Sequence, residues 1–284
     1  ECFILRVLSF NILAQYLLET YRFLYKEHDK QALCWEIRRQ LLLEEILAAQ
    51  ANVICLQEMQ EEHLEEFLIP FKELGYNYLY KRRTNDKKDG LLFLYHSDQL
   101  TLIDYSKVEL YQSGIELLSR DNVGIIAKLA VKKNPQIQLV IATTHLLYNP
   151  RRNDVRLGQT QLLLAEIERT GSKYLPIILM GDFNLEPHSG VYKFIVEGAF
   201  EYQGKGTLTH PFHFNSVYKH KNYHGEREVT TNQGEWITVD YIFYSGLELL
   251  EKYNLPTKCE NLPTIPNFAV GSDHFCLGAT FKLH

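Results

Sequence analysis

The sequence predicts an α/β protein in which a mixed β-sheet, or two packed sheets, carries helices on its outer faces. Short apolar runs rich in β-branched and aromatic residues recur along the chain, and amphipathic stretches of helical period lie between some of them. Their order begins as strand–helix–strand–helix, continues as several closely connected strands, and returns to strand–helix–strand–helix. No repeat, low-complexity tract or Gly/Ser linker divides the 284 residues, so we expect one domain over residues 1–284.

The predicted strands share a short length and a high content of β-branched and aromatic side chains. No apolar run approaches the roughly 20 residues that a membrane-spanning helix needs, so we expect no membrane segment. The predicted strands cover residues 4–10, 53–56, 76–80, 91–95, 123–131, 139–144, 176–180, 239–244 and 276–281.

Two amphipathic stretches predict helices, over residues 35–49 and 154–169, because their apolar side chains recur at helical spacing and leave charged residues outside that stripe. Residues 62–74 and 190–197 are weaker helix candidates. The segment 201–235 is polar and aromatic without a clean period, and we interpret it as loops around a substrate cleft.

Charge and cysteine content limit the class of protein. The net charge is −5, so the chain lacks the overall basic footprint typical of nucleic-acid-binding proteins. Basic clusters at residues 81–83, 87–88, 151–152 and 219–221 are, taken alone, more often solvated surface than phosphate-binding sites. The five cysteines form no CxxC pair, which argues against a disulfide framework and against a structural zinc site.

The dispersed cysteines are most simply interpreted as belonging to a reducing compartment, so we expect an intracellular, cytoplasmic or nuclear protein. The first residue is Glu1 rather than Met, and a strand-like stretch follows at once. We therefore expect the chain to begin inside a longer protein, which leaves organelle targeting open.

Several apolar strands run directly into, or directly follow, an amide, a carboxylate or an imidazole. A single Asn or His at a strand end is usually a turn or capping residue. Desolvated carboxylates, however, are costly unless they are paired or bound to a metal, and perturbable acid–base groups gather at functional sites. If neighbouring strands are antiparallel, we expect these groups to converge on one edge of the sheet and to form a catalytic site. They are Asn11, Glu58, His145, Asp182, Asn184, Asp240, Asp273 and His274.

The residue types favour Mg²⁺, with Mn²⁺ as a second option, because oxygen ligands dominate and imidazoles are few. We expect Glu58 to ligate the metal directly, with Asn11 and Asp273 nearby or acting through water.

The turn Gly181-Asp182-Phe183-Asn184 is the clearest single mark of this chemistry. An extended backbone would place Asp182 and Asn184 on one face and Phe183 on the other, in the core. We expect Asp182 to orient and deprotonate an attacking water, and Asn184 to hold that water or the phosphate. No GxSxG, P-loop, GxGxxG after a strand, or HExxH is present to suggest another mechanism.

The histidines are expected to act on the phosphate. His274 would place positive charge on the phosphoryl oxygens as negative charge builds in the transition state. Asp240 would fix the tautomer of His274 and support its charged form. His145 would be a second donor, or a proton source, on the phosphate side.

The ordered set of motifs resembles the endonuclease/exonuclease/phosphatase superfamily over nearly the whole chain. The resemblance implies a four-layered α/β sandwich, two packed mixed β-sheets flanked by helices, with a Mg²⁺ site at the sheet edge. In that family Glu58 would ligate the metal, and Asp240 and His274 would form a supporting pair. The motifs are Asn11, Glu58, Thr144-His145, Gly181-Asp182-Phe183-Asn184, Asp240 and Ser272-Asp273-His274.

Finer features resemble the branch that contains the poly(A)-shortening nucleases, nocturnin and the Angel proteins, and most of all the Angel proteins. This likeness implies hydrolysis of 2′,3′-cyclic phosphate, and in addition 2′- or 3′-phosphate, at RNA 3′ ends to a free diol. It implies substrate contacts from Arg83, Asn122, Asn149 and Arg151. Segment 201–235 departs from the branch and is where we expect substrate selectivity to lie. The features are residues 8–15, 55–58, 81–83 ahead of Asp89-Gly90, 120–124 and 145–152.

Three alternatives stay open from the sequence. A 3′-5′ exoribonuclease or poly(A) deadenylase would use base-stacking aromatics, for which Tyr148, Phe212, Phe214 and Tyr223 are available. A second alternative is a phosphatase that acts on lipids or on sugar phosphates. The lipid version is disfavoured, since no basic amphipathic helix is present to bind a membrane surface. An inactive binding module of the same fold is disfavoured by the intact set of carboxylates. Residues 244–250 have the spacing of peptides that bind the cap-binding initiation factor, but we expect no such binding through this strand-like segment.

Overall fold

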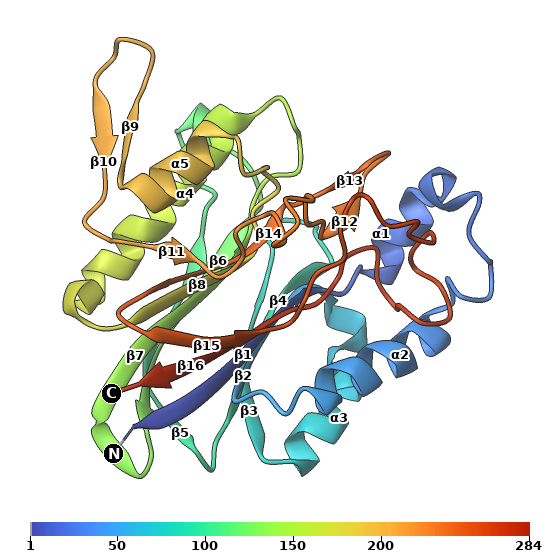
Figure 1. Ribbon diagram of the computed structural model, residues 1–284, viewed down its shortest axis with the longest axis horizontal. Coiled ribbons are helices and arrows are strands. Elements are labelled where there is room, and N and C mark those ends of the chain that lie inside the picture. The colour runs from blue at the N-terminus through green and yellow to red at the C-terminus, as the bar shows by residue number, and fades with distance from the viewer. Residues whose placement is uncertain (1) are drawn as a thin grey trace.

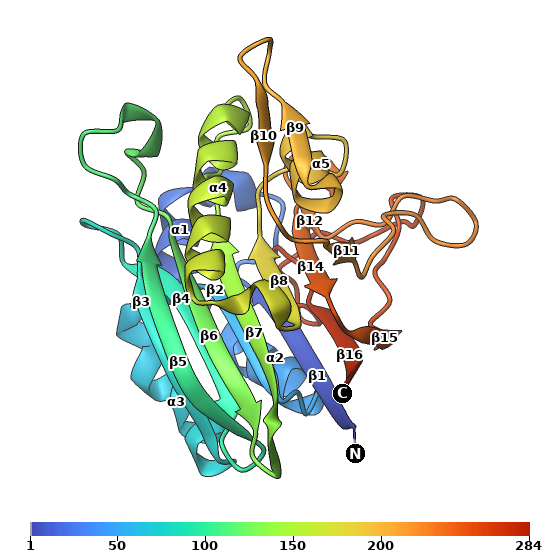
Figure 2. The ribbon, with the colours of Figure 1, turned by 90° about the vertical axis from the view of Figure 1, so that its left-hand side faces the viewer.

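The computed structural model describes residues 2–284 and has four layers. Two six-stranded sheets pack face to face, and helices cover the outer face of each sheet (Figures 1 and 2). Both chain termini lie at one end of the sandwich (Figure 1). The predicted fold class, two packed mixed sheets flanked by helices, is confirmed.

The first sheet has the strand order β15-β16-β1-β2-β4-β3. Its β1 and β2 run parallel, and all its other neighbouring strands are antiparallel. Its strands are β1 (Phe3–Asn11), β2 (Val53–Gln60), β3 (Tyr76–Arg82), β4 (Asp89–His96), β15 (Glu248–Lys252) and β16 (Leu277–Leu283).

The second sheet has the order β11-β14-β8-β7-β6-β5. Its β7 and β8 are parallel, and the remaining pairs are antiparallel. Its strands are β5 (Leu100–Glu109), β6 (Val123–Val131), β7 (Asn134–His145), β8 (Ile177–Asp182), β11 (Asn215–Ser216) and β14 (Asp240–Ser245). Two small ribbons pair β9 (Ala199–Glu201) with β10 (Thr207–Thr209), and β12 (Thr231–Asn232) with β13 (Trp236–Ile237).

The two sheets bury a shared core, and each sheet buries a second core against its own helices. Between the sheets, Phe93 and Phe281 of the first meet Ile125 and Ile141 of the second, and all four side chains are fully buried. Burying an apolar side chain of this size stabilises the fold by about 1.5–3 kcal/mol. Helices α2 and α3 cover the first sheet, and α4 and α5 cover the second. The helices are α1 (Gln15–Thr20), α2 (Trp35–Ala48), α3 (Leu64–Glu73), α4 (Asn153–Arg169) and α5 (Gly190–Glu197), with short 3₁₀ turns η1 (Arg22–Tyr25), η2 (Glu61–His63), η3 (Glu116–Leu118) and η4 (Ser172–Tyr174).

All nine predicted strands and four predicted helices are present, with bounds that differ in places. The strand predicted at 53–56 continues to Gln60 through an irregularity at Glu58, and the strand predicted at 139–144 begins already at Asn134. Helix α1 and strands β5 and β15 were not predicted. Segment 201–235 is not wholly loop, since parts of it pair as β9–β10 and β12–β13. None of the helices among residues 2–284 is long and apolar enough to span a membrane.

Candidate active site

The predicted site residues lie at the end of the sandwich opposite the chain termini (Figure 1). Strands β1 and β2 are parallel, as are β7 and β8, so each pair ends at the same edge of its sheet. Antiparallel β14 begins at that edge, where Asp240 stands opposite Asp182, and Asp182 stands opposite His145 on β7. The fold therefore delivers polar strand ends from both sheets to one place.

Asn11 joins the two sheets. Its Nδ2 donates to Glu58 Oε2 at 2.6 Å and to Asp182 Oδ2 at 2.9 Å, while its Oδ1 accepts from Leu13 N at 3.0 Å. The amide nitrogen, which cannot ligate a metal, thus faces the carboxylates. In this arrangement Asn11 is a donor that holds two carboxylates in position, and its expected place near a metal stays a prediction.

Glu58 occupies an unusual backbone position. It lies at a register shift between β2 and β4 and has a φ of 59°, in the left-handed region that non-glycine residues rarely adopt. Its Oε1 accepts from Ala14 N at 3.3 Å. Burial raises the pKa of its carboxyl, and the nearby charges of Asp273 and Asp89 raise it further. Strain of this kind costs about 1–3 kcal/mol and is typical of functional sites.

The Gly181–Asn184 segment is extended through Asp182, where β8 ends, and bends at Asn184. A Cβ at Gly181 would lie 2.0 Å from the carbonyl oxygen of Thr144, so only glycine fits where β8 approaches β7. Asn184 has a φ of 51°, and its N–H donates to Asp182 Oδ1 at 3.0 Å. The predicted extended backbone therefore holds through Asp182 and fails at Asn184, where the Asp182 side chain closes a turn. Phe183 does lie in the core, packed against Tyr241 and Phe243.

The Asn184 side chain is partly committed to structure. Its Nδ2 donates to the carbonyl oxygen of Leu146 at 2.8 Å, which ties the turn to the segment after β7. Asp182 is 1% exposed, and burial, followed by the charge of Asp240, raises the pKa of its carboxyl. A raised pKa makes this carboxylate a stronger base toward water.

His274 stands between two carboxylates. Its Nδ1 lies 2.8 Å from Asp240 Oδ2, and its Nε2 lies 3.7 Å from Asp182 Oδ2. Burial alone would lower the pKa of His274, but the charge of Asp240 and the hydrogen bond to it raise that pKa well above the ordinary value. The imidazolium is thus the favoured form. Ser272 fixes this segment, since its Oγ donates to Asn11 O at 2.6 Å and accepts from His274 N at 3.2 Å.

His145 approaches Asp182 from the other side, with 3.4 Å between Nε2 and Oδ2. Burial, assisted by the charges of Arg83 and His274, lowers the pKa of His145 to about 3. Near neutral pH its ring is uncharged, so it suits the donor role predicted for it and not the proton-source role. Asn122 holds this residue, because its Nδ2 donates to His145 O at 3.1 Å.

Asp273 fits a cation. Its Oδ2 accepts from the Tyr25 hydroxyl at 2.8 Å, whereas its buried Oδ1 has no hydrogen-bond partner among residues 2–284. Together with Glu58, whose pKa the neighbouring acids raise, it forms an acidic group that a divalent cation would neutralise. These oxygen donors suit Mg²⁺ or Mn²⁺.

A second acidic group is less suited to the metal. The ligand atoms of Asp182, Asp240 and His274 lie within 4.8 Å of one another and could in principle hold an ion. His274 Nδ1 and Asp240 Oδ2, however, already hydrogen-bond to each other. This group therefore suits proton handling, whereas the oxygen atoms of Glu58 and Asp273 suit a metal.

The four predicted substrate contacts differ in how exposed their side chains are. Asn122 is 5% exposed, and its Oδ1 also accepts from Gln159 Nε2 at 2.8 Å, so both ends of its amide form hydrogen bonds within the protein, and its substrate contact stays a prediction. Arg83 Nε donates to Asp89 Oδ1 at 3.1 Å, which holds the guanidinium beside the site. Asn149 and Arg151 are exposed on the segment after β7, where Asn149 Oδ1 accepts from Arg151 N at 3.0 Å.

Buried residues that the sequence analysis missed support these groups. Arg156, 1% exposed, donates to the carbonyl oxygens of Leu147 at 2.9 Å and Asn149 at 2.6 Å, and so holds the segment that carries Arg151. Arg38 is fully buried and donates to Leu13 O at 2.9 Å, just after Asn11. An arginine within the apolar stripe of α4 was a signal that could have identified Arg156.

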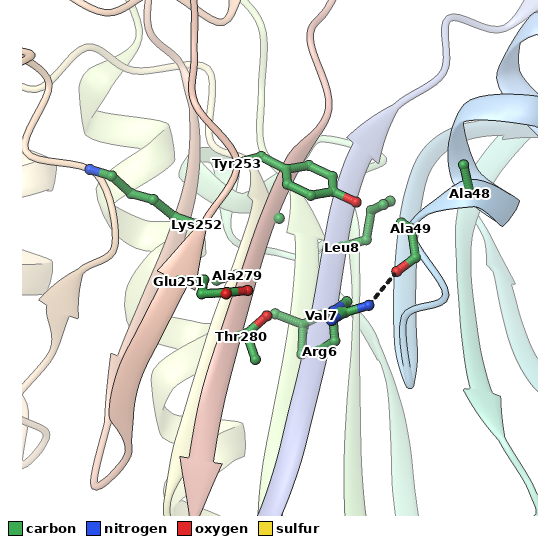
Figure 3. Close-up of a pocket in the computed structure, with 11 residues that line it drawn as sticks. Arg6, Val7, Leu8, Ala48, Ala49, Glu251, Lys252, Tyr253, Ala279 and Thr280 are labelled. Atoms are coloured by element: carbon green, nitrogen blue, oxygen red, sulfur yellow. Dashed lines mark hydrogen bonds between the residues drawn. The ribbon is translucent and has the colours of Figure 1, made fainter.

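A cavity of about 230 Å³ lies away from this edge, between β15, β16, β1 and the end of α2 (Figure 3). Arg6 lines it, and its Nη1 donates to Ala49 O at 3.2 Å (Figure 3). Arg6 precedes Asn11 by five residues of extended strand, roughly 16 Å at about 3.3 Å per residue. This cavity is too distant to take part in chemistry at Asp182.

Comparisons with known proteins agree with this arrangement. A model of the Endonuclease/Exonuclease/phosphatase family matches residues 8–274. Protein angel of Drosophila melanogaster is 38% identical over 298 residues, which cover 100% of this chain and 82% of that protein. Two solved structures are similar over nearly the whole chain. A crystal structure of ANGEL2, a 2′,3′-cyclic phosphatase, in complex with adenosine-2′,3′-vanadate matches with a TM-score of 0.93 at 36% identity, covering 99% of this chain and 96% of that one. The human Nocturnin catalytic domain with bound sulfate matches with a TM-score of 0.74 at 27% identity, covering 99% and 95%.

Proposed function

Because the chain belongs to the endonuclease/exonuclease/phosphatase family and is a phosphoester hydrolase, we propose that it removes 2′,3′-cyclic phosphate from RNA 3′ ends. The proposed cofactor is Mg²⁺, which Mn²⁺ could replace. The carrying observation is the buried Asp182–His274–Asp240 group, set in a fold that matches ANGEL2 with a TM-score of 0.93.

Hydrolysis of a cyclic phosphate to a diol needs two attacks by water at one phosphorus. The first breaks one of the two ester bonds and leaves a 2′- or 3′-phosphomonoester. The second breaks the remaining ester and releases inorganic phosphate and the diol. The same groups serve both steps, which is why we include 2′- and 3′-phosphates among the proposed substrates.

Asp182 acts on the attacking water in this proposal. Its Oδ2 is held by Asn11 Nδ2 at 2.9 Å, and this hydrogen bond together with the charge of His274 favours its ionised form, which can accept a proton from water. Asn184, which the turn places beside it, offers its remaining amide groups to the water or the phosphate.

His274 and His145 act on the phosphoryl oxygens. The charged His274, supported by Asp240 at 2.8 Å, stabilises negative charge as it builds on phosphorus, and the neutral His145 donates an N–H from the other side. Glu58 and Asp273 would hold the cation, whose chemistry is to polarise a phosphoryl oxygen as a Lewis acid. Arg83, Asn149 and Arg151 are proposed to hold the rest of the RNA end.

The structure weakens one argument for the deadenylase alternative. Of the four aromatics available for base stacking, Phe212 and Phe214 are 3% and 4% exposed within the core beneath α5. Tyr148 and Tyr223 are exposed and keep the alternative testable.

Binding of the cap-binding initiation factor is not part of the proposal. The motif spans β14 and β15, and the Tyr244 ring packs on Phe281 with 5.1 Å between centroids. A tyrosine held in this way is not presented on a helix to a partner.

The proposal is tested with a substrate panel in Mg²⁺: RNA ending in 2′,3′-cyclic phosphate, RNA ending in 3′-phosphate, and poly(A) with a free 3′-hydroxyl. We expect turnover of the first, no shortening ladder on the third, and loss of turnover on chelation that Mg²⁺ restores. As a control for substitutions of the active-site acids, Asp104→Asn replaces an exposed acid on β5 and should behave as wild type. A ladder on poly(A) without phosphate release from the cyclic substrate would contradict the proposal in favour of the deadenylase.

A further inference from the structure

A second cavity, of about 490 Å³, lies directly beside the site, between α1, the N-terminal end of α2 and the end of β2. Tyr16 and Gln60 line it, and Tyr16 N donates to Gln60 Oε1 at 3.0 Å. Two residues earlier on each of these segments, Ala14 N donates to Glu58 Oε1 at 3.3 Å. The cavity and the site therefore share the same two segments and lie roughly 7 Å apart along β2, at about 3.3 Å per residue.

The walls of this cavity carry polar atoms that the protein itself leaves unused. Trp35 Nε1, His63 Nδ1 and Gln15 Oε1 are buried and have no hydrogen-bond partner among residues 2–284. Trp35 is 8% exposed, and His63 stacks on it with 4.4 Å between ring centroids. A buried polar group without a partner costs about 1–3 kcal/mol. Three such groups among the lining side chains favour a ligand that hydrogen-bonds to them.

The same cavity offers groups suited to a phosphate. Arg22, Lys30 and Lys88 line it, and none of them forms an ion pair within residues 2–284. The 14-residue helix α2 begins at its wall, and Cys34 at the N-cap position provides no side-chain cap. The first N–H groups of the helix are thus left for an acceptor, and such helix ends bind anions.

Three acidic side chains line the cavity as well: Glu19, Glu62 and Glu36, the last of which stands in the first turn of α2. Glu19 accepts from Gln15 Nε2 at 3.4 Å, and Glu62 accepts from Gln60 Nε2 at 3.1 Å. Their charges offset those of the cations, so the cavity is not a general polyanion-binding patch. It favours a ligand that combines a hydrogen-bonding planar group with a phosphate.

We propose that this cavity is a subsite for one nucleotide of the single-stranded RNA that precedes the reacting 3′ end. A nucleotide supplies base donors and acceptors together with a phosphate, and single-stranded RNA is recognised through bases that leave the stack. The volume lies within the roughly 300–1,000 Å³ typical of ligand pockets. The inference rests on the proposed function, because it assumes an RNA substrate at the adjacent site.

The binding test uses the fluorescence of Trp35. The chain has two tryptophans, so Trp236→Phe leaves Trp35 as the sole reporter. An RNA pentamer with a free 3′-hydroxyl, which the proposed reaction does not change, is titrated against this variant, with adenosine monophosphate in a parallel arm. We expect a saturable change in Trp35 fluorescence with the pentamer and none with the mononucleotide at equal concentration.

The kinetic test compares substrates of different length. Trp35→Phe keeps an aromatic ring and removes the Nε1 donor. We expect its KM for a pentamer ending in 2′,3′-cyclic phosphate to rise about tenfold, the effect of about 1.4 kcal/mol of lost binding. Its kcat, and both constants for adenosine 2′,3′-cyclic monophosphate, should stay unchanged. Lys30→Gln, at the cavity rim, should raise the same KM, whereas Lys26→Gln, exposed on the same segment but outside the cavity, should not.

Several results would overturn the subsite. One is an equal rise in KM for the cyclic-phosphate pentamer and for adenosine 2′,3′-cyclic monophosphate in Lys30→Gln. This result would count even if Trp35→Phe failed to fold. Another is an equal fluorescence change with adenosine monophosphate, which would mark a free-nucleotide site instead. If the wild type released no phosphate from either cyclic substrate, the proposed function would fail, and the fluorescence titration would still decide on the subsite.

Discussion

Strand β7 passes through two different environments. Leu139 and Ile141 lie between the sheets with no exposed surface, among apolar side chains from both sheets. Four residues after Ile141, His145 lies 3.4 Å from the buried carboxylate of Asp182. The interior is held by packing, whereas the edge gathers charges that packing alone would exclude.

The difference shows what the edge costs and what compensates for it. The interior gains free energy from each buried apolar side chain. At the edge, Asn11 donates to two carboxylates, and Glu58 and Asn184 adopt left-handed backbone conformations. Such strain and like-charge burial are maintained in proteins where function requires them. Substitutions at the edge should therefore lower activity and leave the free energy of unfolding little changed. Substitutions in the interior should lower the free energy of unfolding and leave the activity of the folded molecules unchanged.

The largest expected effect is at Asp240. Asp240→Asn should lower kcat on cyclic-phosphate RNA by about a thousandfold, because the charged form of His274 loses its supporting carboxylate. Steady-state kinetics with circular dichroism as a check of the fold measure this. A kcat within tenfold of wild type would show that the pair does not act in the reaction.

The opposite pattern is expected in the interior. Leu139→Ala should lower the free energy of unfolding by about 3 kcal/mol, because it leaves a cavity between the sheets. Its kcat per folded molecule should match wild type. Urea unfolding gives the first quantity and active-site-normalised kinetics the second. Leu250→Ala, at a side chain that is 44% exposed, is the control and should change stability by less than about 0.5 kcal/mol.

Metal binding should stabilise the edge specifically. Mg²⁺ at about 100 times its Kd should add about 2.7 kcal/mol to the free energy of unfolding, since only the folded chain assembles the Glu58 and Asp273 oxygens. Glu58→Gln should remove most of this gain, and Glu44→Gln, exposed on α2, should keep it. Thermal or urea unfolding measures this gain. An equal gain from Mg²⁺ in wild type and in Glu58→Gln would place the metal elsewhere.

The sequence predicted most of the regular structure because the interior strands carry strong local signals. Runs such as 123–131 and 139–144 are short, apolar and β-branched, and they form the central strands β6 and β7. Helices 35–49 and 154–169 were predicted within one residue of each bound, because their apolar stripes face a sheet. Strand β5 was missed because most of its side chains are exposed, so its apolar signal is weak.

The candidate site was predictable in its members and not in its geometry. Asp182, Asp240 and His274 interrupt apolar strands, which is visible in one dimension. The side chains of Glu58 and Asn184 are held by hydrogen bonds from Ala14 and to Leu146, which are distant in sequence. No local pattern encodes such contacts, and the same holds for the hydrogen bond from Tyr25 to Asp273.

A smaller effect would compare two histidines, the buried His274 and the half-buried His220. At the edge, Asp240 raises the pKa of His274, whereas burial, followed by the charges of Lys219 and Lys252, lowers the pKa of His220 from 6.5 to about 4. Between pH 6.5 and about pH 4, His220 binds a proton in the unfolded chain and not in the folded chain. The free energy of unfolding therefore falls as the pH is lowered through this window.

His220→Gln should remove this dependence. We expect wild type to lose about 2–3 kcal/mol more than the variant between pH 6.5 and pH 4. Chemical unfolding at both pH values measures the difference, with His224→Gln, an exposed histidine on the neighbouring segment, as the control. Parallel curves for wild type and His220→Gln would show that the folded chain binds this proton.

The most direct measurement pairs activity with stability in one variant, Asp182→Asn. Replacing this buried carboxylate keeps the side-chain shape and removes one of the edge's like charges. We predict that hydrolysis of cyclic-phosphate RNA falls by about a thousandfold, while the free energy of unfolding measured without metal is unchanged or higher. Retained activity would contradict the assignment of Asp182, and a loss of activity accompanied by an equal loss of stability would contradict the claim that the edge is maintained for chemistry.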